Sequence, residues 1–203
     1  MSLLRAFIAI QIPDKIKNEI AADSVELHRA GDRSVRWVAP GNIHLTVKFL
    51  GNIAAAKLGT LGRALVKVTS QHNPFSLTIA DIGAFPNLRH PRVIWIGVNP
   101  TTALNSLEGN IGKALAELGF SIDDKPFSAH LTIGRVRDQA TPAQIRALTD
   151  ALTKSRPGEL GTFAVETIHL LQSELQPAGP VYTHLFAAAL GGQLLHEVKS
   201  ESA

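Results

Sequence analysis

Apolar and polar residues follow two kinds of pattern along the chain. Short apolar or alternating runs predict strands, and an apolar residue at every third or fourth position predicts an amphipathic helix. Strands are expected over residues 3–12, 35–38, 43–50, 75–84, 92–98, 128–136, 163–171 and 181–190. Helices are expected from Pro13 to Gly31, over residues 54–69, after Thr101 or Thr102, and after Thr141.

The order of these elements indicates the fold class. Several strands are interleaved with about four helices, and hairpin-like strand pairs occur beside helices. This favours an α+β arrangement with mainly antiparallel sheets over a doubly wound parallel sheet. No linker or low-complexity segment divides the chain into separate parts.

A four-residue motif occurs twice. His44-Leu45-Thr46-Val47 and His130-Leu131-Thr132-Ile133 both read His, apolar, Thr, apolar. The two histidines are 86 positions apart (130 − 44 = 86), which is too far for a short solenoid repeat. The spacing suggests two similar halves, each contributing one copy of the motif to a shared cleft.

Strand geometry gives the motif a chemical meaning. Alternate side chains of a strand point to opposite faces, so His44 and Thr46 share one face and Phe49 takes the other. A single His-x-Thr is usually an ordinary surface or core feature, but two copies with similar flanks point to a function. An imidazole can move a proton while the neighbouring hydroxyl donates to an anionic oxygen. Two such pairs facing each other suit attack on a phosphodiester.

Composition changes this picture only mildly. The net charge of +3 and the isoelectric point of about 9.4 favour an anionic ligand such as a nucleotide or an RNA end. The absence of cysteine excludes disulfides and thiolate metal ligands. No apolar run is long enough to cross a bilayer, and the first residues are interpreted as a strand and not as a signal peptide. We therefore expect a cytoplasmic protein without a membrane segment.

Aromatic residues make up 5% of the chain, too few for an extended platform that stacks single-stranded nucleic acid. We expect Phe7, Trp37, Phe49 and Trp95 to lie mainly in the core, with room for one of them to stack on a base at the cleft. The histidines outside the two motifs have no partner motif. Because neither His-x-His nor His-Glu-x-x-His spacing occurs, no metal site is expected.

Characteristic stretches flank the two motifs. They are residues 5–10, Trp37, residues 48–51, 92–98, 134–135, 171–175 and 179–182. Together with the motifs they cover nearly the whole chain. With these flanks the chain resembles the two-histidine phosphoesterase superfamily and, within it, the RNA 2′,3′-cyclic phosphodiesterases, historically called 2′-5′ RNA ligases.

The resemblance implies a bilobal α+β fold with a pseudo-two-fold duplication. Two mainly antiparallel sheets would line a central groove with helices outside, and residues 1–203 would form one two-lobed phosphoesterase domain. The implied reaction is hydrolysis of a 2′,3′-cyclic phosphate on RNA or a nucleoside to a 2′-phosphomonoester, with no metal and no organic cofactor. The implied partners are RNA ends or nucleotides that carry this cyclic phosphate. Neither an obligate protein partner nor an oligomer is implied.

The resemblance also implies roles for the four motif residues. His44 would donate a proton to the departing 3′ oxygen, and His130 would accept one from the attacking water. Thr46 and Thr132 would hold the phosphoryl oxygens. The residues by themselves do not choose between donor and acceptor, because they require only one neutral and one protonated imidazole near pH 7.

Two basic residues are further candidates for binding the substrate. Lys48 lies at an even separation from His44, so alternation places it on the groove face, although a solvated strand lysine is an equal alternative. Arg135 matches a basic position of the family motif but lies at an odd separation from His130. Only a strand end or a bulge at Gly134 would turn it into the groove.

Two other functions remain open at this point. One is joining of RNA ends through a 2′-5′ linkage, which uses the same site in reverse. The other is a non-catalytic module that binds RNA ends, against which the two intact motifs argue. Other cyclic phosphates and oligoadenylates are also compatible with the sequence.

Overall fold

The computed structural model describes residues 3–121, 126–177, 179–191 and 194–197. Its strands form one curled sheet in the order β10-β9-β8-β1-β3-β6-β5-β4-β7, with β2 paired to β6. Every pairing is antiparallel. The strands are β1 (Leu3–Gln11), β2 (Val35–Trp37), β3 (His44–Ala54), β4 (Phe75–Phe85), β5 (Val93–Val98), β6 (His130–Val136), β7 (Glu159–Val165), β8 (Thr167–Gln176), β9 (Gly179–Ala189) and β10 (Leu194–Glu197).

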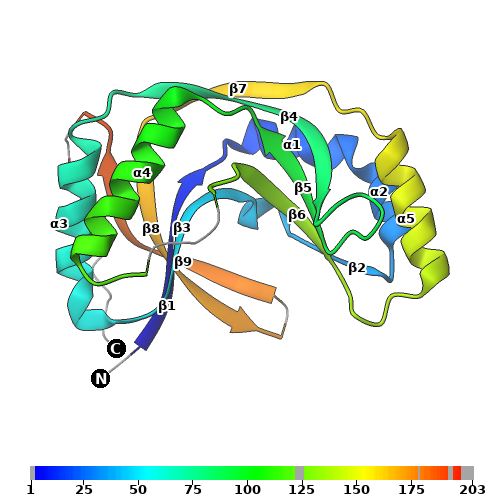
Figure 1. The fold of residues 1–203 in the computed structure, drawn as a ribbon, viewed down its shortest axis with the longest axis horizontal. Coiled ribbons are helices and arrows are strands. Elements are labelled where there is room, and N and C mark those ends of the chain that lie inside the picture. The colour runs from blue at the N-terminus through cyan, green and yellow to red at the C-terminus, as the bar shows by residue number, and fades with distance from the viewer. Residues whose placement is uncertain (1–2, 122–125, 178, 192–193, 198–203) are drawn as a thin grey trace.

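The helices lie outside the curled sheet, as Figure 1 shows. They are α1 (Asp14–Asp23), α2 (Val25–Gly31), α3 (Leu58–Thr69), α4 (Thr102–Glu117) and α5 (Pro142–Lys154), with short 3-10 helices η1 (Pro40–Asn42) and η2 (Ala55–Lys57). Helix α3 contacts α4, and α2 contacts α5, so a helix pair covers each half of the sheet. The α+β expectation is confirmed. Among the described residues, none of the helices combines the length and the apolar character needed to span a membrane.

The sheet has two halves, which meet between β3 and β6. Within the described residues these strands are joined through a single pair, Leu45 and Leu131. On one side of the junction lie β10, β9, β8, β1 and β3, and on the other lie β6, β5, β4 and β7. The two sheets expected from the sequence are therefore the two halves of one continuous sheet, and each half carries one motif.

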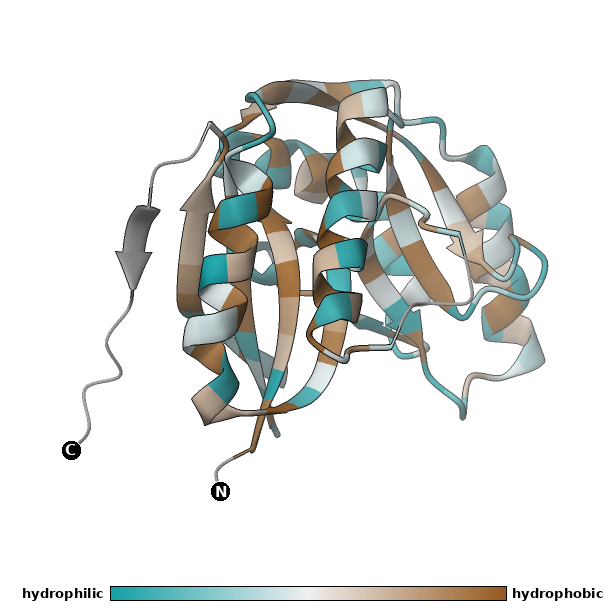
Figure 2. Ribbon diagram, turned by 60° about the vertical axis from the view of Figure 1, so that its left-hand side comes forward, coloured by the Kyte–Doolittle hydropathy of each residue, from teal (hydrophilic) through white to brown (hydrophobic). Residues whose placement is uncertain are grey.

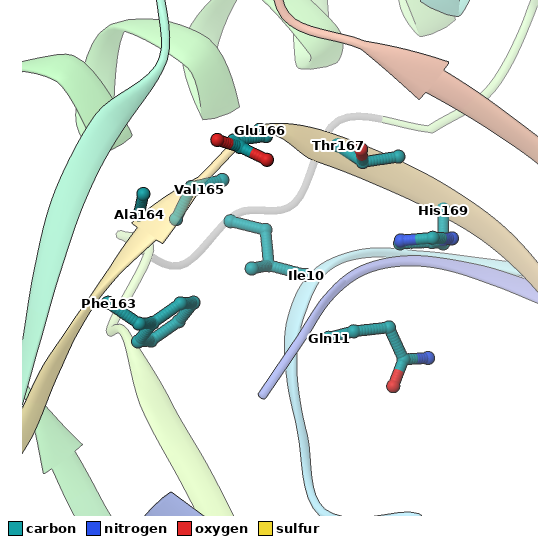
Figure 3. Close-up of a pocket in the computed structure, with 8 residues that line it drawn as sticks. All are labelled: Ile10, Gln11, Phe163, Ala164, Val165, Glu166, Thr167 and His169. Atoms are coloured by element: carbon teal, nitrogen blue, oxygen red, sulfur yellow. The ribbon is translucent and has the colours of Figure 1, made fainter. Parts of the chain in front are cut away.

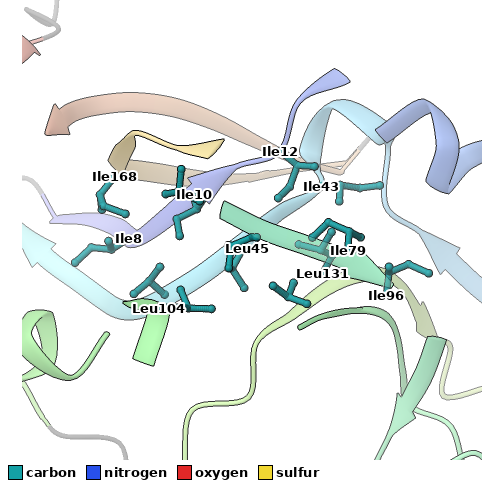
Figure 4. Close-up of a cluster of buried hydrophobic side chains, with 14 of the residues drawn as sticks. Ile8, Ile10, Ile12, Ile43, Leu45, Ile79, Ile96, Leu104, Leu131 and Ile168 are labelled. Carbon is teal, nitrogen blue, oxygen red and sulfur yellow. The ribbon is translucent and has the colours of Figure 1, made fainter. Parts of the chain in front are cut away.

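The main core lies between the sheet and the helices. Leu45 and Leu131 are fully buried at its centre, where Leu104 of α4 and Ile8 of β1 join them (Figure 4). The helices carry hydrophilic and hydrophobic residues side by side along their length, as expected for helices that bury one face (Figure 2). Burial of a side chain such as Leu104 contributes about 1.5–3 kcal/mol. This burial fixes one face of β3 and β6 against the helices and leaves the other face for the polar motif residues.

Two expected elements are each divided in the structure. The helix after Pro13 breaks at Ser24 into α1 and α2, because α1 contacts β7 whereas α2 packs on α5. The strand expected over residues 163–171 breaks at Glu166 into β7 and β8. β7 pairs with β4 in one half and β8 pairs with β1 in the other, so the chain crosses between the halves at this point. Both breaks depend on distant partners, which the local pattern does not contain.

Candidate active site

The two motifs lie side by side at the junction of the sheet halves. Leu45 and Leu131 are paired and both point into the core, where neither has exposed surface. The residues on either side of them therefore point to the opposite face of the sheet. In the antiparallel register of this pair, His44 lies opposite Thr132, and Thr46 lies opposite His130. We call this face, opposite the main core, the groove face.

The two imidazoles are oriented by the same backbone contact. Nδ1 of His44 donates to the carbonyl oxygen of Asn42 at 2.8 Å, and Nδ1 of His130 donates to that of Ser128 at 2.7 Å. A carbonyl oxygen can only accept, so the proton resides on Nδ1 in the neutral ring. Nε2 of each ring is then the nitrogen available for chemistry. In His44 it lies 3.0 Å from Oγ1 of Thr46, so the first half presents this nitrogen beside a hydroxyl.

Aromatic rings enclose His44. Its ring centre lies 4.8 Å from that of Phe7 on β1 and 5.1 Å from that of Tyr182 on β9, with Tyr182 edge-on. A hydrogen bond of 2.8 Å from Nδ2 of Asn42 to the carbonyl of Pro180 ties the start of β9 to η1 and so places Tyr182 against His44. His130 has an edge-on contact with Phe85 at 5.0 Å.

The environment shifts two ionisable groups of the first half. Burial lowers the pKa of His44, and the positive charge of Lys17 lowers it further, while the carbonyl of Asn42 acts in the opposite direction. Burial raises the pKa of the Tyr182 phenol, and the positive charges of Arg135 and Arg5 oppose that shift. Tyr182 is therefore a neutral hydroxyl near pH 7, and two guanidinium groups act on it.

Lys48 does not face the groove, so the expectation from alternation is wrong. Thr46 pairs with Ala9 but Lys48 pairs with Ile8, so Val47 is the extra residue of a β-bulge. Cross-strand partners share a face, and Ile8 points into the core. The Lys48 side chain is buried there, with Nζ 3.9 Å from Oε1 of Glu108 on α4. A phosphate in the groove is therefore out of its reach.

Arg135 reaches the groove face by a second bulge. Thr132 pairs with Trp95 and Gly134 with Ile94, so Ile133 is the extra residue. Arg135 then pairs with Val93 and returns to the face of Thr132. The bulge lies one residue before Gly134, the position at which the sequence suggested it. A Cβ on Gly134 would lie 2.8 Å from Val35 and 2.9 Å from Trp37, so no larger residue fits without displacement.

Several residues of this face were not predicted from the sequence. Arg36 is the strand partner of Arg135, so a second arginine starts from the same face. Tyr182 lies on β9 and Arg5 lies on β1. The distance of each side chain from His44 depends on the curl of the sheet. Their only signal in the sequence was their place inside the flanking stretches quoted above.

A small cavity of about 170 Å³ lies next to the motif of the first half. Gln11, the strand partner of His44, lines it together with His169 of β8 and Phe163 of β7 (Figure 3). Nδ1 of His169 is buried without a hydrogen-bond partner among the described residues. Burial and the neighbouring His184 lower the pKa of His169 to about 4, so its imidazole is neutral near pH 7.

Metal binding has no candidate group in the described part of the chain. No cluster of three or more histidine or acidic side chains lies there in an arrangement suited to a metal ion. The groove face presents the imidazoles and threonine hydroxyls of the two motifs, with Arg135 on the same face.

Comparison with known proteins agrees with the division of the chain into two similar halves. The family model described as LigT-like phosphoesterase matches the chain twice, over residues 10–95 and 96–182. Each match contains one His-x-Thr motif. The chain therefore belongs to the LigT-like phosphoesterase family, within the two-histidine phosphoesterase superfamily.

Relatives of similar length support the same membership. The RNA 2′,3′-cyclic phosphodiesterase of Archaeoglobus fulgidus is 37% identical over 182 residues, covering 90% of this chain and 98% of the relative. The protein of the same name from Methanothermobacter thermautotrophicus is 30% identical, covering 90% of this chain and 96% of the relative.

Solved structures share the fold over nearly the whole chain. TT0787 of Thermus thermophilus superposes with a TM-score of 0.77 at 26% identity, covering 94% of this chain and all of the other. E. coli LigT complexed with 3′-AMP gives a TM-score of 0.71 at 28% identity, covering 93% of this chain and 99% of the other.

Proposed function

We propose that the chain hydrolyses RNA or nucleoside 2′,3′-cyclic phosphates to 2′-phosphomonoesters, as an RNA 2′,3′-cyclic 3′-phosphodiesterase. The observation that carries the proposal is the pairing of Leu45 with Leu131 at the junction of the sheet halves. Through this pairing the imidazoles and threonine hydroxyls of both motifs share the groove face. Proteins named for this activity are similar to the chain over most of its length. The proposed reaction needs proton transfer and stabilisation of anionic oxygens, and these four groups supply both.

In the proposed mechanism, His130 accepts a proton through Nε2 from the attacking water. The water oxygen bonds to phosphorus while the bond from phosphorus to the 3′ oxygen breaks. His44 gives its Nε2 proton to that oxygen, which becomes the 3′ hydroxyl. Thr46 and Thr132 donate hydrogen bonds to the non-bridging oxygens as their charge grows. The scheme requires neither a metal ion nor an organic cofactor.

The electrostatics of the free protein bear on the donor role of His44. Burial and Lys17 lower its pKa, which favours the neutral ring before substrate binds. A phosphodiester is an anion, and a nearby opposite charge favours the protonated imidazole. In this scheme the bound substrate itself raises the pKa of His44 and lets it hold the proton that it donates.

Arg135 is proposed to bind the phosphate. Its place on the groove face after the bulge, and the effect of its charge on Tyr182, support this role. A guanidinium matches a phosphate with two parallel hydrogen bonds. Lys48 has no part in this proposal, because its ammonium lies on the core side of the sheet near Glu108.

Both motifs belong to one chain, so the proposed site needs no second copy. We propose that residues 1–203 act as one two-lobed domain, as a monomer and in the cytoplasm. Sedimentation at micromolar concentration tests the monomer, and fractionation of cells tests the location.

The test of the function is hydrolysis of a 2′,3′-cyclic mononucleotide in the presence of EDTA, with 2′- and 3′-phosphate products separated. We expect the 2′-phosphate from the wild-type protein, and its formation should be slower by about 10²- to 10⁴-fold in His130→Ala. A 3′-phosphate product would move the leaving group to the 2′ oxygen. No turnover on mononucleotides or on RNA ends would contradict the proposal. Formation of joined strands from cyclic-phosphate and 5′-hydroxyl ends would favour ligation instead.

A further inference from the structure

Phe49 lies on the groove face and not in the core. The bulge at Val47 inverts the alternation, so that Phe49 pairs with Phe7, and 65% of its surface is exposed. Among the large hydrophobic side chains exposed in the described part of the chain, it is the aromatic one. A single exposed apolar residue needs no explanation by itself. The position of this ring beside the candidate site is what calls for one.

Phe49 ends a row of rings that begins at His44. The ring centres of His44 and Phe7 are 4.8 Å apart, and those of Phe7 and Phe49 are 6.2 Å apart. Phe7 is buried under Tyr182, whereas Phe49 is open to solvent. The row therefore leads from the proposed reaction centre to an uncovered aromatic surface.

A positive charge lies next along the same face. Arg5 is two residues from Phe7 on β1, so its side chain shares the groove face, and it is exposed. Its charge also acts on Tyr182, which places it within electrostatic reach of the site. A stacking ring followed by a guanidinium matches a nucleotide, which presents a base and a phosphate.

We propose that Phe49 stacks on the base of the nucleotide that precedes the terminal cyclic phosphate, and that Arg5 pairs with the phosphate of that nucleotide. This inference rests on the proposed function and names its substrate class as an RNA strand in preference to a mononucleotide. Aromatic rings stack on all four bases, so this position discriminates little between sequences. The fold thus provides a subsite for RNA outside the four motif residues.

The first experiment compares two substrates, a 2′,3′-cyclic mononucleotide and a trinucleotide ending in the same cyclic phosphate. We expect Phe49→Ala to lower kcat/KM for the trinucleotide about tenfold, in the range of one stacking interaction. The ratio of trinucleotide to mononucleotide kcat/KM should fall by the same factor. Phe49→Trp, which keeps a ring, should preserve the ratio. Val25→Ala on α2, which removes an exposed apolar residue elsewhere, is the matched control.

A second experiment does not depend on turnover. Binding of a fluorescent trinucleotide ending in a 2′-phosphate should weaken about tenfold in Phe49→Ala. In Arg5→Gln the slope of log affinity against log salt should decrease by about one. Equal losses for mononucleotide and trinucleotide, or no loss for either, would overturn the stacking role. Binding that follows these expectations without any hydrolysis would overturn only the proposed reaction.

Discussion

The two halves of the site share their polar geometry and differ in their packing. Nδ1 of each histidine donates a hydrogen bond to the carbonyl oxygen two residues before it. Each motif strand also has a bulge directly after its threonine. His44 contacts the rings of both Phe7 and Tyr182, whereas His130 has an edge-on contact with Phe85. The orientation of the imidazole is thus a property of the repeated backbone, and the surrounding rings vary independently of it.

The bulges define which residues of the two halves correspond. Lys48 corresponds to Gly134 on the core side, and Phe49 corresponds to Arg135 on the groove face. In the first of these pairs, Lys48 places its amine near Glu108, whereas Gly134 has no side chain because Trp37 fills the corresponding space. The same backbone position therefore serves packing in two different ways.

The neighbours of the motif threonines show an exchange of volume. In the first half Thr46 pairs with Ala9 on the next strand, and Ala9 pairs with His169 on the strand after that. In the second half Thr132 pairs with Trp95, and Trp95 pairs with Gly83. A Cβ on Gly83 would lie 2.2 Å from the Trp95 ring, so the small and the large residue depend on each other. In the first half the large ring is His169, on the third strand counted from the motif strand. In the second half it is Trp95, on the second strand. The motif strand has the same bulged geometry in both halves.

Replacing each motif histidine tests whether the halves contribute equally to the proposed reaction. We expect His44→Ala and His130→Ala each to lower kcat by about 10²- to 10⁴-fold, the range of general acid–base catalysis. The double variant should be little slower than the slower single variant, because the two groups act as a unit. Single-turnover hydrolysis, with circular dichroism as a control of folding, measures this. A single variant with near-normal turnover would remove its half from the scheme.

Filling the glycine of the second half tests the packing difference. Gly134→Ala should lower the free energy of unfolding by about 1–3 kcal/mol, because the new methyl group meets Val35 and Trp37. Gly158→Ala is the control, since a Cβ there meets nothing within 4 Å. Urea unfolding of both variants measures the difference. Equal stability of the two variants would show that Trp37 moves aside without cost.

His169, on the first half alone, should make stability depend on pH. Its pKa is about 4 in the folded protein, against 6.5 for a solvated histidine such as that of the unfolded chain. The unfolded chain therefore binds the proton more readily, and stability is lost as pH falls from about 6.5 to 4. After a discount for partial exposure, the loss is on the order of 1–2 kcal/mol. His169→Asn should show a smaller decrease in urea unfolding across this range, and an unchanged decrease would assign it to other groups.

The smallest expected effect concerns Lys17, which has a charge effect on His44. Lys17→Gln should raise the pKa of His44 by a few tenths of a unit, as expected for one screened charge. If His44 is the proton donor, activity requires its protonated form, and the alkaline limb of the kcat/KM profile moves to higher pH. Movement of the acidic limb would instead make His44 the acceptor and reverse the two roles.

The sequence predicted the motif strands because alternation and duplication are local signals. For Arg135 the sequence offered a bulge at Gly134, because a glycine inside a strand marks a possible bulge. The extra residue in the structure is Ile133, one position earlier. The bulge at Val47 has no such marker, so Lys48 and Phe49 were assigned to the wrong faces. The placement of Arg36 and Tyr182 on the groove face depends on which distant strands pair. The division of residues 163–171 into β7 and β8 depends on the same pairing. Register and curl, which long-range pairing determines, were beyond the local pattern.

The single pair at the junction has the form of a contact between two identical molecules. In a symmetric dimer interface, residue i of one subunit meets j of the other, and j meets i. Here Leu45 meets Leu131, the same position of the motif in each half, so each histidine lies across from the threonine of the other half. The chain thus contains within itself the symmetry of a homodimer. In the proposed scheme neither half holds all four motif groups, so the product of a gene encoding one half would have to self-associate before that chemistry could occur.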